Sequence, residues 1–134
     1  MAKAYGNTVN NDQVVYAFAE AAITLEEPGS ALCVVYTGDE YGEIEVPGAD
    51  GVEIAGFLYS NAEAGKKCDV AKGRQFWVPV AEAISIGDRL MCEITTGRVK
   101  VATTGKFICG TALTAQATVA GFVLVDAKIG PQEA

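Results

Sequence analysis

Beyond residue 30, short runs of apolar or alternating residues recur about every ten positions, as in all-β sandwiches and barrels. Gly, Asp or Pro bounds each run, and none is long enough for a helix. The pattern therefore predicts a succession of short strands. They cover residues 31–36, 43–46, 52–59, 67–71, 75–80, 89–94, 99–102, 106–113 and 119–125.

The runs differ in how many of their faces are apolar. Charged and apolar residues alternate in 43–46 and 98–101, which predicts strands with one wet face. The side chains expected to point inward are Ile44, Val46, Val99 and Val101. Runs 106–113 and 119–125 are apolar on both faces, so we predict central strands that are covered on both sides.

Two hairpins are expected from their turn residues. Residues 67–80 would turn at Gly73 and residues 89–102 at Gly97, because glycine adopts the positive φ that tight hairpins require. Residues 14–25 are ambiguous, since β-branched and aromatic residues precede several alanines that would suit a helix. We predict strand for this segment, followed by a turn at Pro28 and Gly29.

The 134 residues fit one domain with one ordinary hydrophobic core. Residues 1–13 are polar and rich in Asn, which predicts a flexible N-terminal arm. We expect one β-domain over residues 14–126 and a C-terminal tail over residues 127–134, whose last five residues, 130–134, form a frayed polar terminus. The expected fold class is all-β, a compact small β-barrel or sandwich with an extended N-terminal arm.

Ten basic and seventeen acidic residues give a net charge of −7, so the chain repels a phosphate backbone. Direct nucleic-acid binding is therefore not expected. The first residues have no apolar segment typical of a signal peptide, and no uncharged apolar run is long enough to span a bilayer. We expect a protein that is made in a cytoplasm and has no membrane partner.

The residue types needed for common catalytic and metal sites are missing. The chain has no histidine, no Cys-x-x-Cys spacing and no P-loop, so neither a zinc site, a thiol–imidazole pair nor a nucleotide site is expected. The four cysteines stand among apolar or strand-like neighbours, which predicts buried, reduced thiols used as small hydrophobes. We therefore expect no enzyme, no cofactor and no metal.

The acidic stretch 39–53 leaves one catalytic alternative open. Its carboxylates could hold calcium or act as an acid–base pair, in which case substitution of Glu43 or Glu45 would abolish an activity. The spacing does not match an EF-hand loop, and both glutamates fall on one side of a predicted strand. We favour a solvated edge that protects the strand from aggregation.

Trp77 is the only tryptophan and lies between Phe76 and Val78 in a predicted strand. Such a strand must bury aromatic side chains on both faces or present one to a partner. We favour Trp77 in the core and keep open its use as an interface anchor, a role in which tryptophan is enriched. If exposed, Phe76 and Trp77 are the candidate subunit contacts.

Three segments together resemble the tailed-phage capsid decoration, or cement, protein family. They are Ala64-Gly-Lys-Lys-Cys-Asp-Val-Ala-Lys-Gly-Arg-Gln-Phe-Trp-Val-Pro-Val80, Ile86-Gly-Asp-Arg-Leu-Met-Cys-Glu-Ile-Thr-Thr-Gly-Arg-Val99 and Phe107-Ile-Cys-Gly-Thr-Ala-Leu113. The resemblance covers about residues 29 to 126 and consists of turn-and-strand patterns without a chemical signature. The long Asn-rich arm and the acidic stretch depart from it.

The resemblance implies a β-tulip-like fold similar to that of the lambda head decoration protein. It also implies homotrimers that bind the major capsid protein on the outer surface of the expanded head and stabilise the shell against DNA pressure. We expect the arm to order on the capsid, with Tyr5, Val14, Val15 and Tyr16 as contacts that add a strand to a neighbouring sheet. The alternative is a non-catalytic virion-surface module that binds carbohydrate or a host surface.

Overall fold

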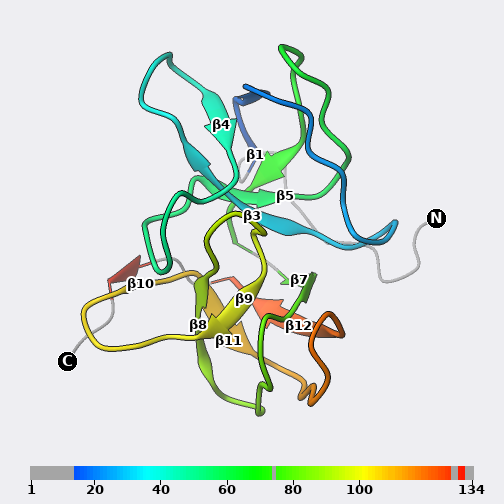
Figure 1. Cartoon of the computed structure of the whole chain (residues 1–134), viewed down its shortest axis with the longest axis vertical. Helices are drawn as coiled ribbons and strands as arrows, with labels where there is room; N and C mark the ends of the chain where they lie inside the picture. Colours follow the sequence, from blue (N-terminus) through cyan, green and yellow to red (C-terminus); the bar gives the residue numbers. More distant parts are fainter. Residues whose placement is uncertain (1–13, 74, 128–129, 132–134) are drawn as a thin grey trace.

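The computed structural model describes residues 14–73, 75–127 and 130–131, and within these ranges it contains strands, turns and no helix. The expected all-β sandwich is therefore confirmed, with two main sheets (Figure 1). The predicted arm, including Tyr5, lies outside the described residues. The strands are β1 (Val14–Val15), β2 (Phe18–Ala19), β3 (Leu32–Tyr36), β4 (Glu43–Glu45), β5 (Gly56–Leu58), β6 (Val70–Ala71), β7 (Gln75–Pro79), β8 (Arg89–Cys92), β9 (Val99–Val101), β10 (Phe107–Ile108), β11 (Gly110–Ala112), β12 (Phe122–Asp126) and β13 (Gly130–Pro131).

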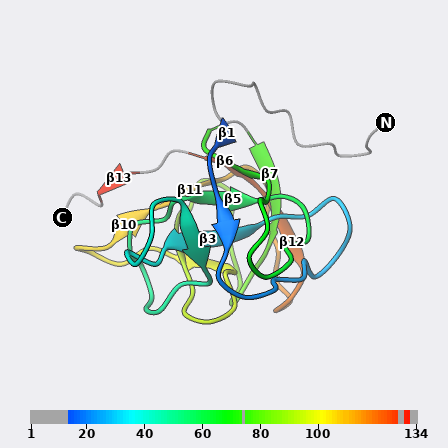
Figure 2. The ribbon, with the colours of Figure 1, turned by 90° about the horizontal axis from the view of Figure 1, so that it is seen from above.

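The first sheet has the order β1-β6-β5-β3-β4-β2, so two strands that are consecutive in the chain lie at its opposite ends. Only residues 16–17 separate β1 from β2, so the sheet must curl until its ends meet. Bridges from Phe18 to Lys67 and from Ala19 to Ala64 join β2 to the segment before β6. Figure 2 shows β1, β6, β5 and β3 following one another across this sheet.

The second sheet has the order β7-β12-β11-β8-β9 and is curled in the same way. A bridge between Val80, just after β7, and Val99 in β9 joins its two ends. The Ala81 N–H donates to the carbonyl of Val99 at 2.8 Å and reinforces the junction. A small third sheet pairs β10 with β13. Gly130–Pro131, which the sequence assigned to the frayed tail, is therefore a paired strand.

Two hydrophobic clusters divide the side chains of β3 between them. Cys33 and Val35 point into the larger cluster, which lies between the two sheets and contains the stacked rings of Phe57 and Phe76. Leu32 and Val34 point into a smaller cluster inside the curled first sheet. Because both faces of β3 are covered, this strand is buried from residue 32 to residue 35.

The hairpin predicted over residues 89–102 is confirmed, since β8 pairs antiparallel with β9 and Gly97 has a φ of 72°. The hairpin predicted over residues 67–80 is wrong. β6 pairs with β5 and β1 in the first sheet, whereas β7 pairs with β12 in the second. Gly73 does have a positive φ, but the turn carries the chain from one sheet to the other.

Within the runs predicted as central strands, β11 and β12 are indeed interior strands of the second sheet. The prediction that both of their faces are covered is wrong, because β12 alternates between buried and half-buried residues. Its outer face carries Phe122 and Leu124, and exposed Phe107 belongs to β10. Strands β3, β5 and β6 send buried side chains into both hydrophobic clusters, so both of their faces are covered.

Residues 14–25 form strand rather than helix, as predicted, but in short pieces. β1 and β2 are separated by two residues, and Ile23 adds a further bridge to Ala62. The pieces are short because β1 pairs with β6 whereas β2 pairs with β4. This change of partner places Tyr16 at the junction of the two ends of the first sheet.

Candidate functional site

An exposed group of tyrosines and carboxylates surrounds the end of the first sheet at which β2 pairs with β4. Tyr16 is 51% exposed, Tyr36 is 46% exposed and Tyr41 is 87% exposed. We call this group the tyrosine–carboxylate surface. It consists of Tyr16, Tyr36, Tyr41, Glu20, Asp39, Glu40, Glu43 and Glu45.

The ring of Tyr16 is held by contacts on several sides. It stacks on the ring of Tyr41 with centroids 5.9 Å apart and planes 10° apart, and it meets Phe18 at 6.3 Å. A Cβ placed on Gly42, whose φ is 82°, would lie 2.5 Å from the Tyr16 ring, so only glycine allows this close approach. The ammonium of Lys67 lies 6.0 Å from the centroid of the Tyr16 ring. The aromatic platform is therefore preformed.

The carboxylates of this surface crowd one another. Repulsion from Glu45, with smaller contributions from burial, Glu43 and Asp39, raises the pKa of Glu20 above its ordinary value. Glu43 accepts a hydrogen bond from the Thr37 hydroxyl at 2.6 Å. Carboxylate oxygens of Glu20, Asp39 and Glu43 lie within 4.8 Å of one another. Such a set offers oxygen ligands to a hard cation, but its members are at the surface, where acidic groups commonly gather without one.

Asp50 shows that part of the acidic stretch is structural. Its carboxylate accepts the Ile94 N–H at 2.8 Å and pairs with the Lys100 ammonium at 3.2 Å, which ties the loop before β5 to the β8–β9 hairpin. The hydrogen bond from Ile94 lowers the pKa of Asp50, and Lys100 lowers it further, against the effect of burial. The stretch is therefore divided between a packed loop and an exposed surface.

We expect Asp50→Asn to lower the free energy of unfolding at pH 7 by about 1 kcal/mol, because the ion pair is partly screened by solvent. A carboxyl whose pKa is lowered by folding stabilises above its unfolded pKa, and this contribution disappears as the pH falls through the folded pKa. Urea unfolding should thus show a difference from the wild type that is largest at pH 7 and shrinks as the pH falls below about 4.

Glu20→Gln serves as a control, because it should change the free energy of unfolding in the opposite direction to Asp50→Asn. Since folding raises the pKa of Glu20, ionisation of this group opposes folding as the pH rises above about 4.3. The variant should be more stable than the wild type at pH 7 and equal to it below pH 4. A destabilised Glu20→Gln protein at pH 7 would contradict the electrostatic description of this surface.

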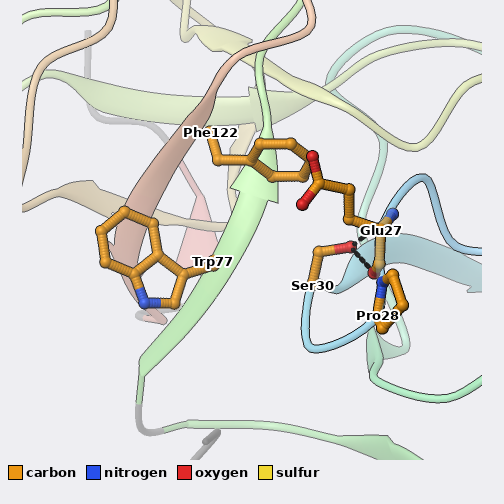
Figure 3. Close-up of a pocket in the computed structure, with 5 residues that line it drawn as sticks. All are labelled: Glu27, Pro28, Ser30, Trp77 and Phe122. Carbon is orange, nitrogen blue, oxygen red and sulfur yellow. Dashed lines mark hydrogen bonds between the residues drawn. The ribbon is translucent and has the colours of Figure 1, made fainter. Parts of the chain in front are cut away.

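A second candidate site is a mostly apolar pocket of about 220 Å³ on the outer face of the second sheet. Figure 3 shows the rings of Trp77 from β7 and Phe122 from β12 on one side, and the turn containing Glu27, Pro28 and Ser30 on the other. Trp77 pairs with Leu124 and Phe122 pairs with Pro79, so these rings are diagonal neighbours on one face.

The turn that forms the other wall of the pocket is fixed in place. The Ser30 hydroxyl donates to the carbonyl of Glu27 at 2.6 Å (Figure 3). Both carboxylate oxygens of Glu26 accept hydrogen bonds from the guanidinium of Arg98, at 2.8 and 3.0 Å. Such a two-point pair adds geometric specificity, so the turn is anchored to the end of the β8–β9 hairpin. The pocket therefore does not depend on a ligand for its shape.

The structure places the predicted contact residues at different depths. Tyr16 and Val14 are exposed, and Val14 and Val15 already pair with β6 of their own chain. Phe76 has no exposed surface, so the subunit contact predicted for it is corrected: the alternation of β7 turns its ring into the core. Trp77 is half-buried on the opposite face, so our preference for Trp77 inside the core is also corrected.

Sequence reasoning missed the partners of Tyr16. Tyr36, Tyr41 and Glu20 were not identified, although two tyrosines flank the acidic turn at residues 38–40. Their proximity to Tyr16 comes from the parallel pairing of β2 with β4, in which Phe18 lies opposite Glu43. A parallel pair joined over such a distance has no local sequence signal.

The cysteines behave largely as predicted. Cys33, Cys92 and Cys109 are buried in the larger cluster as free thiols, whereas Cys68 is half-buried. A hydrogen bond with Cys109 and burial raise the pKa of Cys33, and burial raises the pKa of Cys92. Thiols of this kind are poor nucleophiles. In the described part of the chain, no helix has the length and apolar character needed to cross a membrane.

Comparison with known proteins finds similar folds among the solved structures. No protein-family model matches the chain, and no curated protein sequence matches it. The N base of the head fibre gp8.5 of bacteriophage phi29 has a similar structure, with a TM-score of 0.65 and 14% sequence identity. The similarity covers 90% of this chain and 98% of that chain.

This finding corrects the family suggested by the sequence. The turn-and-strand segments resembled capsid cement proteins, but the structural match is to the base of a phage head fibre. The turns and strands quoted for the resemblance recur in many small β-proteins, which explains why they did not identify the family. At 14% identity the match shows a shared fold.

Proposed function

We propose that the chain is a non-catalytic structural protein of a phage head, acting as a base that attaches to the outer surface of the capsid. The supporting observation is that the similarity to the phi29 head-fibre base extends over nearly the whole of both chains. The exposed aromatic groups on two faces suit a protein that acts through its surfaces, since aromatic residues are enriched at interfaces.

The first sheet offers the end at which we place the capsid contact. The sheet closes at Phe18 and Ala19, but within the described residues β1 pairs only with β6, which leaves its other edge available to a further strand. Val14 is 41% exposed beside it, and Tyr16 follows directly. We propose Val14, Val15 and Tyr16 as capsid contacts. In this proposal the capsid adds a strand to the edge of β1, whereas the sequence suggested that a free arm adds a strand to the capsid.

We further propose that Trp77 is a subunit contact in a homotrimer. The Trp77 pocket is apolar and has fixed walls, and a half-buried tryptophan beside a phenylalanine is a typical anchor. A trimer presents three copies of a weak capsid contact at once, which raises the overall affinity through effective concentration. This arrangement separates the subunit interface on the second sheet from the capsid contact on the first.

Co-sedimentation with empty heads tests the proposal. The purified chain should bind saturably, with a fixed number of copies, to expanded heads assembled from the major capsid protein of the same phage. Tyr16→Ala should weaken this binding by removing a capsid contact. Trp77→Ala should weaken it by dissociating the trimer, which light scattering would detect as a lower molar mass. Absence of saturable binding at micromolar concentration would contradict a role on the capsid.

A surface-recognition module is the second candidate, because exposed aromatic rings beside carboxylates also suit carbohydrate binding. The copy number in purified virions separates the two functions. A base that occupies repeated capsid positions is abundant, whereas a receptor-binding module is scarce. Quantitative mass spectrometry against the major capsid protein gives this ratio.

A further inference from the structure

We infer that the tyrosine–carboxylate surface binds an extended, arginine-bearing segment of a partner protein. Each guanidinium would stack on the exposed rings and donate hydrogen bonds to the surrounding carboxylates. That the partner belongs to a phage head rests on the proposed function. The chemistry of the surface stands on its own residues.

The first support is the fixed geometry of the rings. Tyr16 is held against Tyr41, Phe18 and the backbone of Gly42, so little rotamer freedom remains to be lost when a partner stacks on it. Tyr41 is 87% exposed and offers most of its ring to solvent. A shallow hollow of about 400 Å³, lined by Tyr36, Tyr41 and the turn at residues 38–40, lies beside it.

The second support is charge. Five carboxylates of this surface belong to residues 20 to 45, and repulsion from Glu45, Glu43 and Asp39 raises the pKa of Glu20. A cation at this position would relieve that repulsion and contribute to binding. Lys67 already places its ammonium 6.0 Å from the Tyr16 centroid, which shows that the platform accepts a cation over its ring.

Arginine suits this surface better than lysine. The guanidinium is planar, stacks on aromatic rings and presents a fork of donors that matches a carboxylate at two points. An ammonium offers a point charge and is more strongly hydrated. In an extended segment, every second side chain points to one face, so successive arginines could reach Tyr41 and the carboxylates of β4 together.

The test measures binding of a capped peptide with alternating glycine and arginine to the full chain, by fluorescence anisotropy at low salt. Matched peptides carry lysine or neutral citrulline in place of arginine. We expect lysine to weaken binding about fivefold and citrulline to abolish it. Raising the ionic strength should weaken the arginine complex, since the surface is exposed.

Two variants of the surface should each weaken the arginine peptide about fivefold, Tyr41→Ala by removing a stacking ring and Glu20→Gln by removing a charge. Their matched controls are Phe107→Ala, an exposed ring in β10, and Glu53→Gln, an exposed carboxylate outside the surface. The controls should change binding less than twofold. Tyr41 is 87% exposed and loses only its stacking on Tyr16, so its truncation should lower the free energy of unfolding by no more than about 1 kcal/mol.

Equal effects of Glu20→Gln and Glu53→Gln would overturn the inference, because binding would then follow net charge alone. Binding of neutral oligosaccharides without binding of the arginine peptide would also overturn it and assign the surface to carbohydrate. The head-binding experiment tests the proposed function independently. If the chain binds the arginine peptide but not heads, the inference about this surface is supported and the proposed function is contradicted.

Discussion

Gly97→Ala should lower the free energy of unfolding by about 4 kcal/mol, a large part of the 5–15 kcal/mol typical of a domain. The φ of 72° costs an alanine about 1–2 kcal/mol. In addition, its Cβ would lie 2.7 Å from the carbonyl oxygen of Cys33 in β3. The backbone there cannot retreat freely, because the Cys33 N–H donates to the Gly97 carbonyl at 2.9 Å and Cys33 pairs with Phe57.

Gly105→Ala separates the two costs. Gly105 has a similar φ of 86°, but a Cβ there meets no atom within 4 Å. This variant should lose only the conformational part, about 1–2 kcal/mol. Urea unfolding of both variants gives the comparison. Equal losses would show that the turn of the β8–β9 hairpin is not packed against β3 as described.

Phe76→Ala should cost about 3–5 kcal/mol, the range for removing a buried phenylalanine ring. Phe76 in β7 has no exposed surface and stacks on Phe57 in β5, with ring centroids 4.9 Å apart. The two rings belong to different sheets, so the cavity would open at the interface that joins them. Gln75→Ala, at an exposed position of the same strand, should stay within about 0.5 kcal/mol of the wild type.

A double-mutant cycle with Phe57→Leu and Phe76→Leu tests whether these rings link the sheets. We expect a coupling energy of about 0.5–1.5 kcal/mol, typical of an aromatic pair. Leucine keeps much of the apolar volume, so both single variants should fold. Additive effects of the two substitutions would mean that the rings contribute through separate contacts.

Local patterns predicted the strands better than their partners. The alternation of Val99 with Lys100 and the glycine at position 97 were sufficient for the β8–β9 hairpin, because its two strands are close in the chain and pair with each other. The same reasoning failed at Gly73, since a positive φ fixes the turn but not the sheet that the next strand joins. Sheet assignment depends on burial of distant residues, such as Phe76 against Phe57.

The candidate site could be predicted from the sequence only in part, again because the pairing of distant strands has no local signal. Tyr16 was identified from its β-branched neighbours, and Trp77 from being the only tryptophan. The hydrophobic period does not say that Tyr41 stacks on Tyr16 or that Glu20 meets Glu45, since both contacts arise from the pairing of β2 with β4. The sequence also did not show whether the side chain of Trp77 points into the core, because this depends on which face of β7 packs against the other sheet.

The position of β1 and β2 at opposite ends of the first sheet sets an order for events during synthesis. Val14 and Phe18 leave the ribosome early, but their partners Ala71 and Glu43 are made much later. The nascent segment must therefore wait, with its valines and aromatic rings in water, until the rest of the sheet has emerged. We expect the first sheet to form only after Ala71 has emerged from the ribosome.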